Sequence, residues 1–487
     1  MLARANAALA SGEEAASLAE VEELLVQDRS DARLWQWHGL LLRALDRRGA
    51  AIPSFRQAAR LLPSDLSIAH GHARVVLEAG LDAVPLFERA RSLNPVEGDV
   101  LLGLASARFA QGDAATAMRE LQAMLDLEPR WISGHGALSQ LRRLTGHGGA
   151  FAASFARALN VRPAEPALWQ AYAATVLRAG HHEQGLKIIA DARKALGSQA
   201  FLDPLEAFAR SEAGDLQGAD RLYAALAADE DAGAAMHRVR HLLRAGRADA
   251  AVPILDRWIT AGEGAELWPY ASIAWRLLDD PRAAWLEGDA RLVSVIDLAD
   301  RLPSLDCLAR LLRGLHQAQA PHFDQSVRGG TQTDGALFAR IEPELVAVRK
   351  VVLDAVAQHI AQLPASDPTH PTLAPRRDRE PRFAGSWSVR LRGGGSHAAH
   401  VHTHGWISSA LYVALPEPTP DDAPQSGWLT LGAPQAELGI DLPQYRAVEP
   451  KPGRLVLFPS TLWHGTIPFA AGERLTIAFD IARPATL

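Results

Sequence analysis

The sequence is poor in three features, and each shortage excludes a class of protein. Cys307 is the only cysteine among 487 residues, so no intrachain disulfide can form. The formal net charge is -6, which is not the electrostatic footprint of a protein that binds nucleic acid or an anionic membrane. No apolar run reaches the roughly 20 residues that a bilayer-spanning helix needs. With one thiol and no recognisable signal peptide, we expect a cytoplasmic protein.

The first half of the chain repeats itself. Glycine recurs with steps of 32 to 34 residues, at Gly80, Gly112, Gly146, Gly180, Gly214 and Gly246. Prolines keep a similar interval at Pro63, Pro95, Pro129 and Pro163. Each unit consists of an apolar helix, a Gly turn, a second amphipathic helix and a stop. Over residues 1–264 this pattern resembles tetratricopeptide repeats, which stack into a superhelix with a concave groove.

The repeats leave two roles open. They form either a scaffold or oligomerisation arm, or a groove that holds a peptide or protein, and we favour the groove. Residues 265–365 lose the period, and we interpret them as a helical segment that supports the C-terminal domain. Within it, residues 321–335 ("PHFDQSVRGGTQTDG") are predicted to form a polar loop, which is either an ordinary connection or one that reaches toward a site.

Residues 366–487 begin with a Pro- and charge-rich connector and then change to short strands. We predict strands within 386–391, 397–402, 408–415, 427–432, 454–459 and 474–482, separated by Gly and Pro turns. The predicted fold is therefore a multidomain α + β chain: a helical-repeat superhelix, then a double-stranded β-helix, or jelly roll, with supporting helices.

The stretch "HAAHVHTHGW" holds four of the 18 histidines. In an extended strand, alternate side chains share a face, so His400, His402 and His404 would point the same way. Two neighbours at this spacing can chelate one ion, and imidazole suits Fe, Zn, Cu or Ni. Taken alone, the cluster is equally compatible with solvated histidines in a loop.

A second group lies far along the chain. His464 follows a strand, and ten residues later Arg474 shares a strand face with Thr476 and Ala478. A basic side chain pointing into an apolar shell is costly unless it meets an anion, and Arg matches a carboxylate bidentately. Together the two groups predict a site with two nearby histidines, one distant histidine and an Arg for a carboxylate-bearing co-substrate.

These motifs together resemble the Fe(II)/2-oxoglutarate-dependent oxygenases, in particular those found behind tetratricopeptide repeats in bacteria. The resemblance spans about residues 305–482. It rests on Asp324–Thr333, the His400/His402 pair, Gly405–Val413, Pro450–Ser460 and Trp463–Phe469. It implies that His400, His402 and His464 hold the iron, and that Arg474, with Thr476, holds 2-oxoglutarate. One departure is that His402 stands where the family has a carboxylate. Geometry also allows His404 as an alternative ligand beside His402.

Other residues are weaker candidates. Tyr412 and Arg390 are co-substrate candidates, although a half-buried strand position and a surface position, respectively, would also explain them. The substrate-proximal candidates are His397, Gln332, Thr333 and Trp406.

The resemblance implies a dioxygenase that uses dioxygen and 2-oxoglutarate and usually hydroxylates its substrate. We expect a peptide or protein substrate, because repeats precede the oxygenase-like segment. Two alternatives stay open: an inactive oxygenase-like scaffold, suggested by the missing carboxylate, and an oxygenase of a small metabolite.

Overall fold

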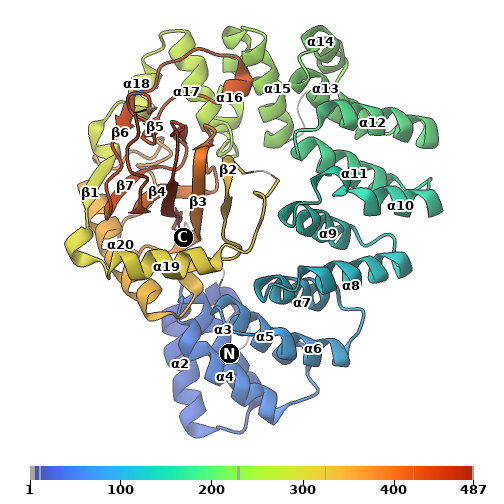
Figure 1. The fold of residues 1–487 in the computed structure, drawn as a ribbon, viewed down its shortest axis with the longest axis vertical. Helices are drawn as coiled ribbons and strands as arrows, with labels where there is room; N and C mark the ends of the chain where they lie inside the picture. The colour runs from blue at the N-terminus through green and yellow to red at the C-terminus, as the bar shows by residue number, and fades with distance from the viewer. Residues whose placement is uncertain (1–5, 10–11, 227–230, 324, 421, 485–487) are drawn as a thin grey trace. The chain divides into compact units, whose positions relative to one another are not determined.

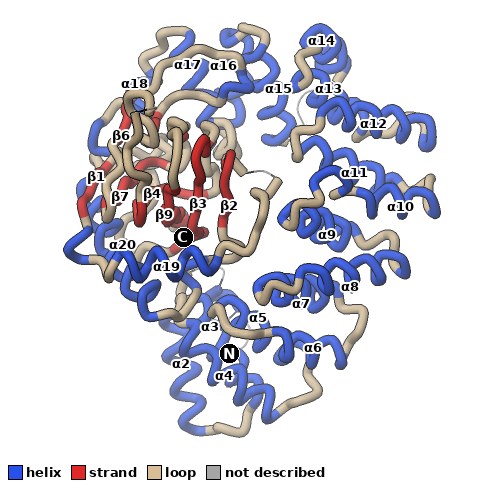
Figure 2. The backbone as a smooth tube through the Cα atoms, in the orientation of Figure 1, coloured by secondary structure: helices blue, strands red, loops and turns tan. Residues whose placement is uncertain are grey.

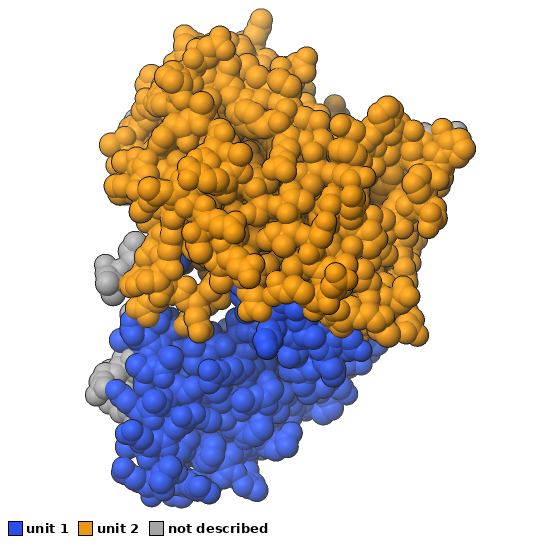
Figure 3. Space-filling view, turned by 90° about the vertical axis from the view of Figure 1, so that its left-hand side faces the viewer, with its two compact units in different colours: residues 1–128, 333–353, 484–487 blue, residues 129–332, 354–483 orange. Residues whose placement is uncertain are grey.

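The structure is a computed structural model that describes residues 6–9, 12–226, 231–323, 325–420 and 422–484. By their internal contacts, the residues form two compact units (Figure 3). The first comprises residues 1–128, 333–353 and 484–487, and the second comprises residues 129–332 and 354–483. The predicted division into residues 1–264, 265–365 and 366–487 stays a prediction.

The first unit is helical. Its helices are α2 (Glu14–Gln27), α3 (Ala32–Ala44), α4 (Arg48–Leu61), α5 (Leu66–Glu78), α6 (Val84–Leu93), α7 (Gly98–Ala110) and α8 (Ala114–Leu127). The short η4 (Leu337–Ala339) and the first part of α20 (Pro343–Gln362) also belong to it. Successive helices pack in pairs, α3 on α4, α5 on α6 and α7 on α8.

The second unit continues the helical repeats and adds the strands. Its repeat helices are α9 (Ile132–Leu144), α10 (Ala153–Val161), α11 (Pro166–Arg178), α12 (His182–Leu196), α13 (Leu202–Glu212), α14 (Leu216–Ala225), α15 (Ala232–Arg244) and α16 (Ala248–Thr260). After them come α17 (Trp268–Leu277), α18 (Arg282–Glu287) and α19 (Leu305–Leu315). The short helix η1 (Gly148–Ala150) lies between α9 and α10, and η2 (Ala290–Leu292), η3 (Ala299–Arg301) and η5 (Ala436–Leu438) follow α18.

The recurring glycines form the predicted turns. All six have positive φ, between +71° and +89°. Each lies two residues beyond a helix end; Gly180, for example, follows α11, and the next residue, His181, donates its N–H to the carbonyl of Val176. Glycine adopts this left-handed conformation without a Cβ penalty, so the period in the sequence marks the helix ends. The predicted helical-repeat architecture is confirmed.

The strands of the second unit form two antiparallel sheets (Figures 1 and 2). The larger sheet has the order β1-β7-β4-β9-β3-β2, and the smaller has the order β6-β5-β8. The strands are β1 (Ser294–Asp297), β2 (Val327–Gln332), β3 (Phe383–His397), β4 (Gly405–Ala414), β5 (Leu429–Leu431), β6 (Arg446–Val448), β7 (Arg454–Pro459), β8 (His464–Thr466) and β9 (Glu473–Ala482). The sheets do not close into a barrel, and the arrangement agrees with the predicted jelly roll.

Three local predictions are wrong. Ser294–Asp297, predicted to be helical, is an edge strand on β7, and Val327–Gln332, predicted to be a loop, pairs with β3. Of the strand predicted within residues 397–402, only His397 belongs to a strand, as the last residue of β3, and a turn at residues 403–404 leads into β4. In the first two cases the strand state depends on a partner strand distant in sequence, which local pattern does not reveal.

A shared hydrophobic core joins the last repeat helices to the sheets. Trp258 of α16 and Trp275 of α17 belong to the same buried cluster as Leu438 and Trp463. The Trp463 indole N–H also donates to the carbonyl of Pro269 at 2.9 Å. The turn that precedes His464 is therefore fixed by the helices. Within the described residues, no helix is both long and apolar enough to cross a membrane.

Candidate metal centre

The connection between β3 and β4 carries His400 and His402. Its residues still alternate, because Ala399 and Val401 pack against the helical core while His400 and His402 line a pocket. Backbone hydrogen bonds hold it in place: His400 and His464 exchange N–H···O bonds of 2.9 and 3.0 Å. The His402 N–H donates to the carbonyl of Ser460 at 2.9 Å.

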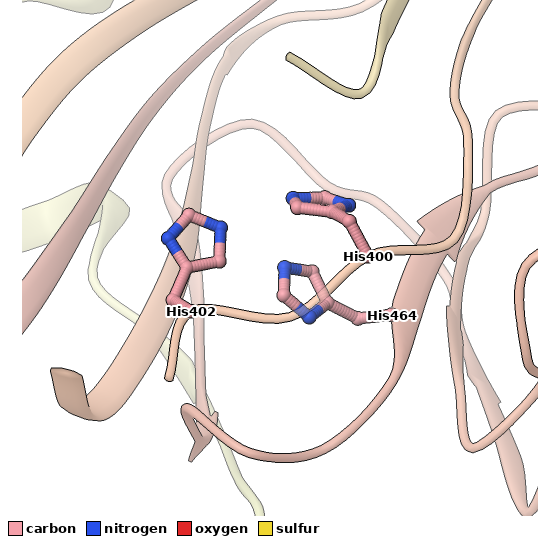
Figure 4. Close-up of side chains that lie close together, drawn as sticks. All are labelled: His400, His402 and His464. Atoms are coloured by element: carbon pink, nitrogen blue, oxygen red, sulfur yellow. The ribbon is translucent and has the colours of Figure 1, made fainter. Parts of the chain in front are cut away.

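Three histidines converge in this pocket (Figure 4). One ring nitrogen from each of His400, His402 and His464 lies within 4.8 Å of the others. The ring centroids are 4.1 Å apart for His400 and His464, and 5.0 Å apart for His400 and His402. Nitrogens at this separation need only small side-chain movements to bind one ion, because Zn–N bonds, for example, are about 2.0–2.1 Å.

Hydrogen bonds fix the orientation and the tautomer of each imidazole ring. The Nδ1–H groups of His400 and His464 donate to the carbonyls of Ala398 and Leu462, at 2.9 and 3.0 Å. The Nδ1–H of His402 donates to a carboxylate oxygen of Asp480 at 2.7 Å. Each acceptor therefore assigns the proton to Nδ1, which leaves Nε2 with a lone pair for a metal.

Burial keeps His397, His400 and His464 neutral. It lowers the pKa of His464 and of His400 well below the usual value, and neighbouring histidines lower both further. Burial also lowers the pKa of His397 to about 3, with Arg474 adding to the effect. Neutral imidazole is the form that binds metal, so these nitrogens are available at neutral pH.

Arg474 lies in the same pocket on β9, and its side chain is buried. Among the described residues, no group forms a hydrogen bond with its Nε or Nη1. The guanidinium carbon lies 5.0 Å from the centroid of the Tyr412 ring, and Thr476 lines the pocket beside it. Burial lowers the pKa of Arg474. A buried cation with unused donors suits a carboxylate ligand.

Arg390 does not reach this pocket. In the β3–β9 register, Leu391 pairs with Arg474, and paired residues face the same side of the sheet. The neighbouring residue Arg390 therefore faces the opposite side. There it forms an ion pair with Glu473. The structure therefore does not support Arg390 as a co-substrate ligand.

Of the other predicted site residues, some line the pocket and others lie outside it. His397 lines the pocket, and its Nδ1 is 2.9 Å from the Ser326 hydroxyl. His404 is not with the three histidines: the turn exposes 89% of its side chain, and Nε2 lies 4.0 Å from Glu266. The Trp406 indole is buried, and its N–H donates to the carbonyl of Thr372 at 2.8 Å.

Gln332 and Thr333 are also absent from the pocket lining. Gln332 ends the edge strand β2, and Thr333 belongs to the first compact unit. Asp324, the first residue of the motif that contains both, lies outside the described residues.

Asp480 is a pocket residue that the sequence reasoning missed. It lines the pocket with Arg474, Thr476 and Ala478, two residues further along the same face of β9. Its carboxylate accepts hydrogen bonds from His402 Nδ1 and from the Ser408 hydroxyl, the latter at 2.6 Å. The alternation that assigned Arg474, Thr476 and Ala478 to one strand face also assigns Asp480 to that face, so the sequence did contain the signal.

The donor set fits a divalent transition metal. Three imidazoles, each donating its Nδ1–H to a fixed acceptor and directing Nε2 to the pocket, form a nitrogen site suited to Fe, Zn, Cu or Ni. Arg474 in the pocket lining offers a place for an organic acid. Both iron and 2-oxoglutarate therefore fit the residues present.

Comparison with known proteins supports an oxygenase domain. Residues 385–480 match the family described as "Putative 2OG-Fe(II) oxygenase". The chain thus combines helical repeats with a C-terminal span that matches this oxygenase family. No curated protein sequence matches the chain.

Several solved structures resemble parts of the chain. A tetratricopeptide repeat protein from Parabacteroides merdae shares 13% identity over 46% of this chain and 89% of its own, with a TM-score of 0.31. A prolyl-4-hydroxylase from Pseudomonas putida shares 21% identity over 43% of this chain and 97% of its own, with a TM-score of 0.28. Similarities of this size indicate nothing about substrate.

Proposed function

We propose that this chain is an Fe(II)/2-oxoglutarate-dependent dioxygenase that hydroxylates a peptide or protein side chain held by its repeats. The proposal depends chiefly on one observation: the buried Arg474, with unused donors, shares a pocket with three convergent histidines. Metal-binding histidines alone would suit many proteins, and a buried Arg alone would be costly. The combination matches a metal together with a carboxylate co-substrate.

The proposed roles follow from the contacts. His400, His402 and His464 hold the metal through Nε2, and the carbonyls of Ala398 and Leu462 keep two of the rings oriented. Arg474 binds the distal carboxylate of 2-oxoglutarate, with Thr476 beside it. When bound, iron with 2-oxoglutarate and dioxygen supplies the oxidising chemistry.

The apolar walls of the pocket have a role of their own. Leu429 and Phe458 line it, and the Tyr412 ring lies against the guanidinium of Arg474. These side chains exclude water from the Arg474 end, which strengthens the attraction between the guanidinium and a carboxylate.

Contacts between the repeats and the segment that precedes β2 support a peptide substrate. The Arg143 guanidinium of α9 donates to the carbonyl of Pro321 at 3.0 Å, and the Phe151 and Phe323 ring centroids are 4.9 Å apart. A few residues later, the Ser326 hydroxyl is 3.2 Å from Nε2 of His400. Residues 321–326 thus contact both the repeat region around α9 and a metal ligand, which favours a substrate that binds to the repeats.

Turnover tests the proposal. Purified protein with Fe(II), dioxygen and 2-oxoglutarate should release succinate faster when a peptide library is added, and mass spectrometry should find a peptide heavier by one oxygen. If no peptide is modified and a small metabolite accelerates succinate release instead, the peptide assignment is wrong. If no succinate forms under any condition, the inactive-scaffold alternative is correct.

A further inference from the structure

Asp480 is connected to the proposed metal site through one ring. One carboxylate oxygen accepts from Nδ1 of His402 at 2.7 Å, and the other accepts from the Ser408 hydroxyl at 2.6 Å. Since the single Ser408 proton is used there, the Ser460 hydroxyl, 2.9 Å away, must donate to Ser408. Both oxygens are thus engaged, and the carboxylate has one orientation.

His402 differs from the other two histidines in this respect. His400 and His464 donate to neutral backbone carbonyls, whereas His402 donates to an anion. The ring of Trp387 stacks against His402 with centroids 5.4 Å apart and planes 4° from parallel. His402 is therefore held at its Nδ1 by a negative charge and along its face by an aromatic ring.

The charge balance of the pocket shows why Asp480 matters for metal binding. Among the described residues that line the pocket, Asp480 is the single acid. Imidazole ligands carry no negative charge, so three of them leave the two positive charges of a divalent ion uncompensated by any direct ligand. A carboxylate that accepts the Nδ1–H of a ligating His makes Nε2 a stronger donor and fixes the ring.

We propose that Asp480 is a positioning residue that supplies, through His402, the negative charge that the three imidazoles lack. This inference rests on the proposed function. It explains how a site with His402 in place of a carboxylate can still hold a divalent ion firmly. In this arrangement the carboxylate acts on the metal through the His402 ring instead of binding the metal directly.

Cobalt(II) is a suitable probe, because its visible spectrum reports ligand strength and geometry without turnover. Asp480→Asn keeps a carbonyl oxygen for His402 Nδ1 but removes the charge. We expect it to weaken Co(II) binding about tenfold to a hundredfold and to shift the Co(II) absorption band. Ser408→Ala, which frees the carboxylate to rotate, should produce a smaller change in the same direction and remains informative if Asp480→Asn fails to fold.

Glu473→Gln is the matched control. It removes one negative charge from the same strand on the opposite face, where Glu473 pairs with Arg313 and Arg390. It should bind Co(II) as the wild type does. The inference is overturned if Asp480→Asn binds with wild-type affinity and spectrum, or if Glu473→Gln weakens binding equally. A wild-type chain that takes up no Co(II) overturns the proposed function, and this inference with it.

Discussion

Glu287 shows how burial of a single carboxyl changes the pH dependence of stability. Burial raises its pKa from 4.5 to about 7, although the Ser272 hydroxyl donates to it at 2.6 Å. Between these values the folded state holds a proton that the unfolded state has released. Its contribution to the free energy of unfolding is therefore fully present below pH 4.5 and is lost as the pH rises to about 7.

Glu287→Gln should remove this dependence. The amide stays neutral and can still accept from Ser272, so the variant should gain stability relative to the wild type as the pH rises from 5 to 8. Thermal unfolding midpoints of both proteins at the two pH values check this. A difference between the proteins that is the same at pH 5 and pH 8 would contradict the assignment.

At the residue scale, alternation predicted much of the site. It assigned Arg474 and Thr476 to one strand face and His400 and His402 to another, and the structure brings all four to one pocket. It failed at His404, because a turn at residues 403–404 breaks the pattern, and a turn of this kind leaves little local signal.

At the scale of elements, the turn glycines have a left-handed backbone conformation that would strain any residue with a side chain. Gly180 has φ of +79°, and a Cβ added there would meet nothing within 4 Å, so backbone strain is the only cost of a side chain. Gly180→Ala should lower stability by about 1–2 kcal/mol. Gly136, inside α9, also has open space around a Cβ, and Gly136→Ala should stabilise by about 0.5–1 kcal/mol.

Denaturant unfolding of the two variants beside the wild type measures both effects. Equal changes in the two variants would show that the left-handed turn is not the reason for the glycine.

The same elements show what sequence can predict: the glycine period gave the helix ends, but β1 was predicted to be helical because its strand state depends on pairing with β7.

At the scale of the whole molecule, the oxygenase-like sheets share a core with the last repeat helices. Ala251 and Trp258, before the predicted boundary at residue 264, pack in one cluster with Trp275, Leu438 and Trp463 after it. No local pattern could have revealed this, because the partners are up to about 200 residues apart and meet only in the folded chain.

Truncation tests this shared core. A chain of residues 265–487 loses α15 and α16 and so uncovers part of the cluster that contains Leu438 and Trp463. Each fully buried apolar side chain in such a cluster contributes about 1.5–3 kcal/mol. It should unfold at a lower temperature than residues 198–487, which keep α13 to α16. Thermal unfolding followed by near-ultraviolet circular dichroism compares the two. Equal midpoints would mean that the boundary at residue 264 separates independent domains.

The central claim is that one pocket binds a metal through three histidines and a dicarboxylate through Arg474. Anaerobic titration with Fe(II) and 2-oxoglutarate, followed by metal analysis and absorption spectroscopy, tests it in the wild type, His464→Ala and Arg474→Ala. We predict that the wild type binds one of each, that His464→Ala loses the iron, and that Arg474→Ala keeps the iron but binds 2-oxoglutarate at least tenfold more weakly, since a charged hydrogen bond contributes about 1.5–3 kcal/mol. Normal iron content in His464→Ala, or unchanged 2-oxoglutarate affinity in Arg474→Ala, would contradict the claim.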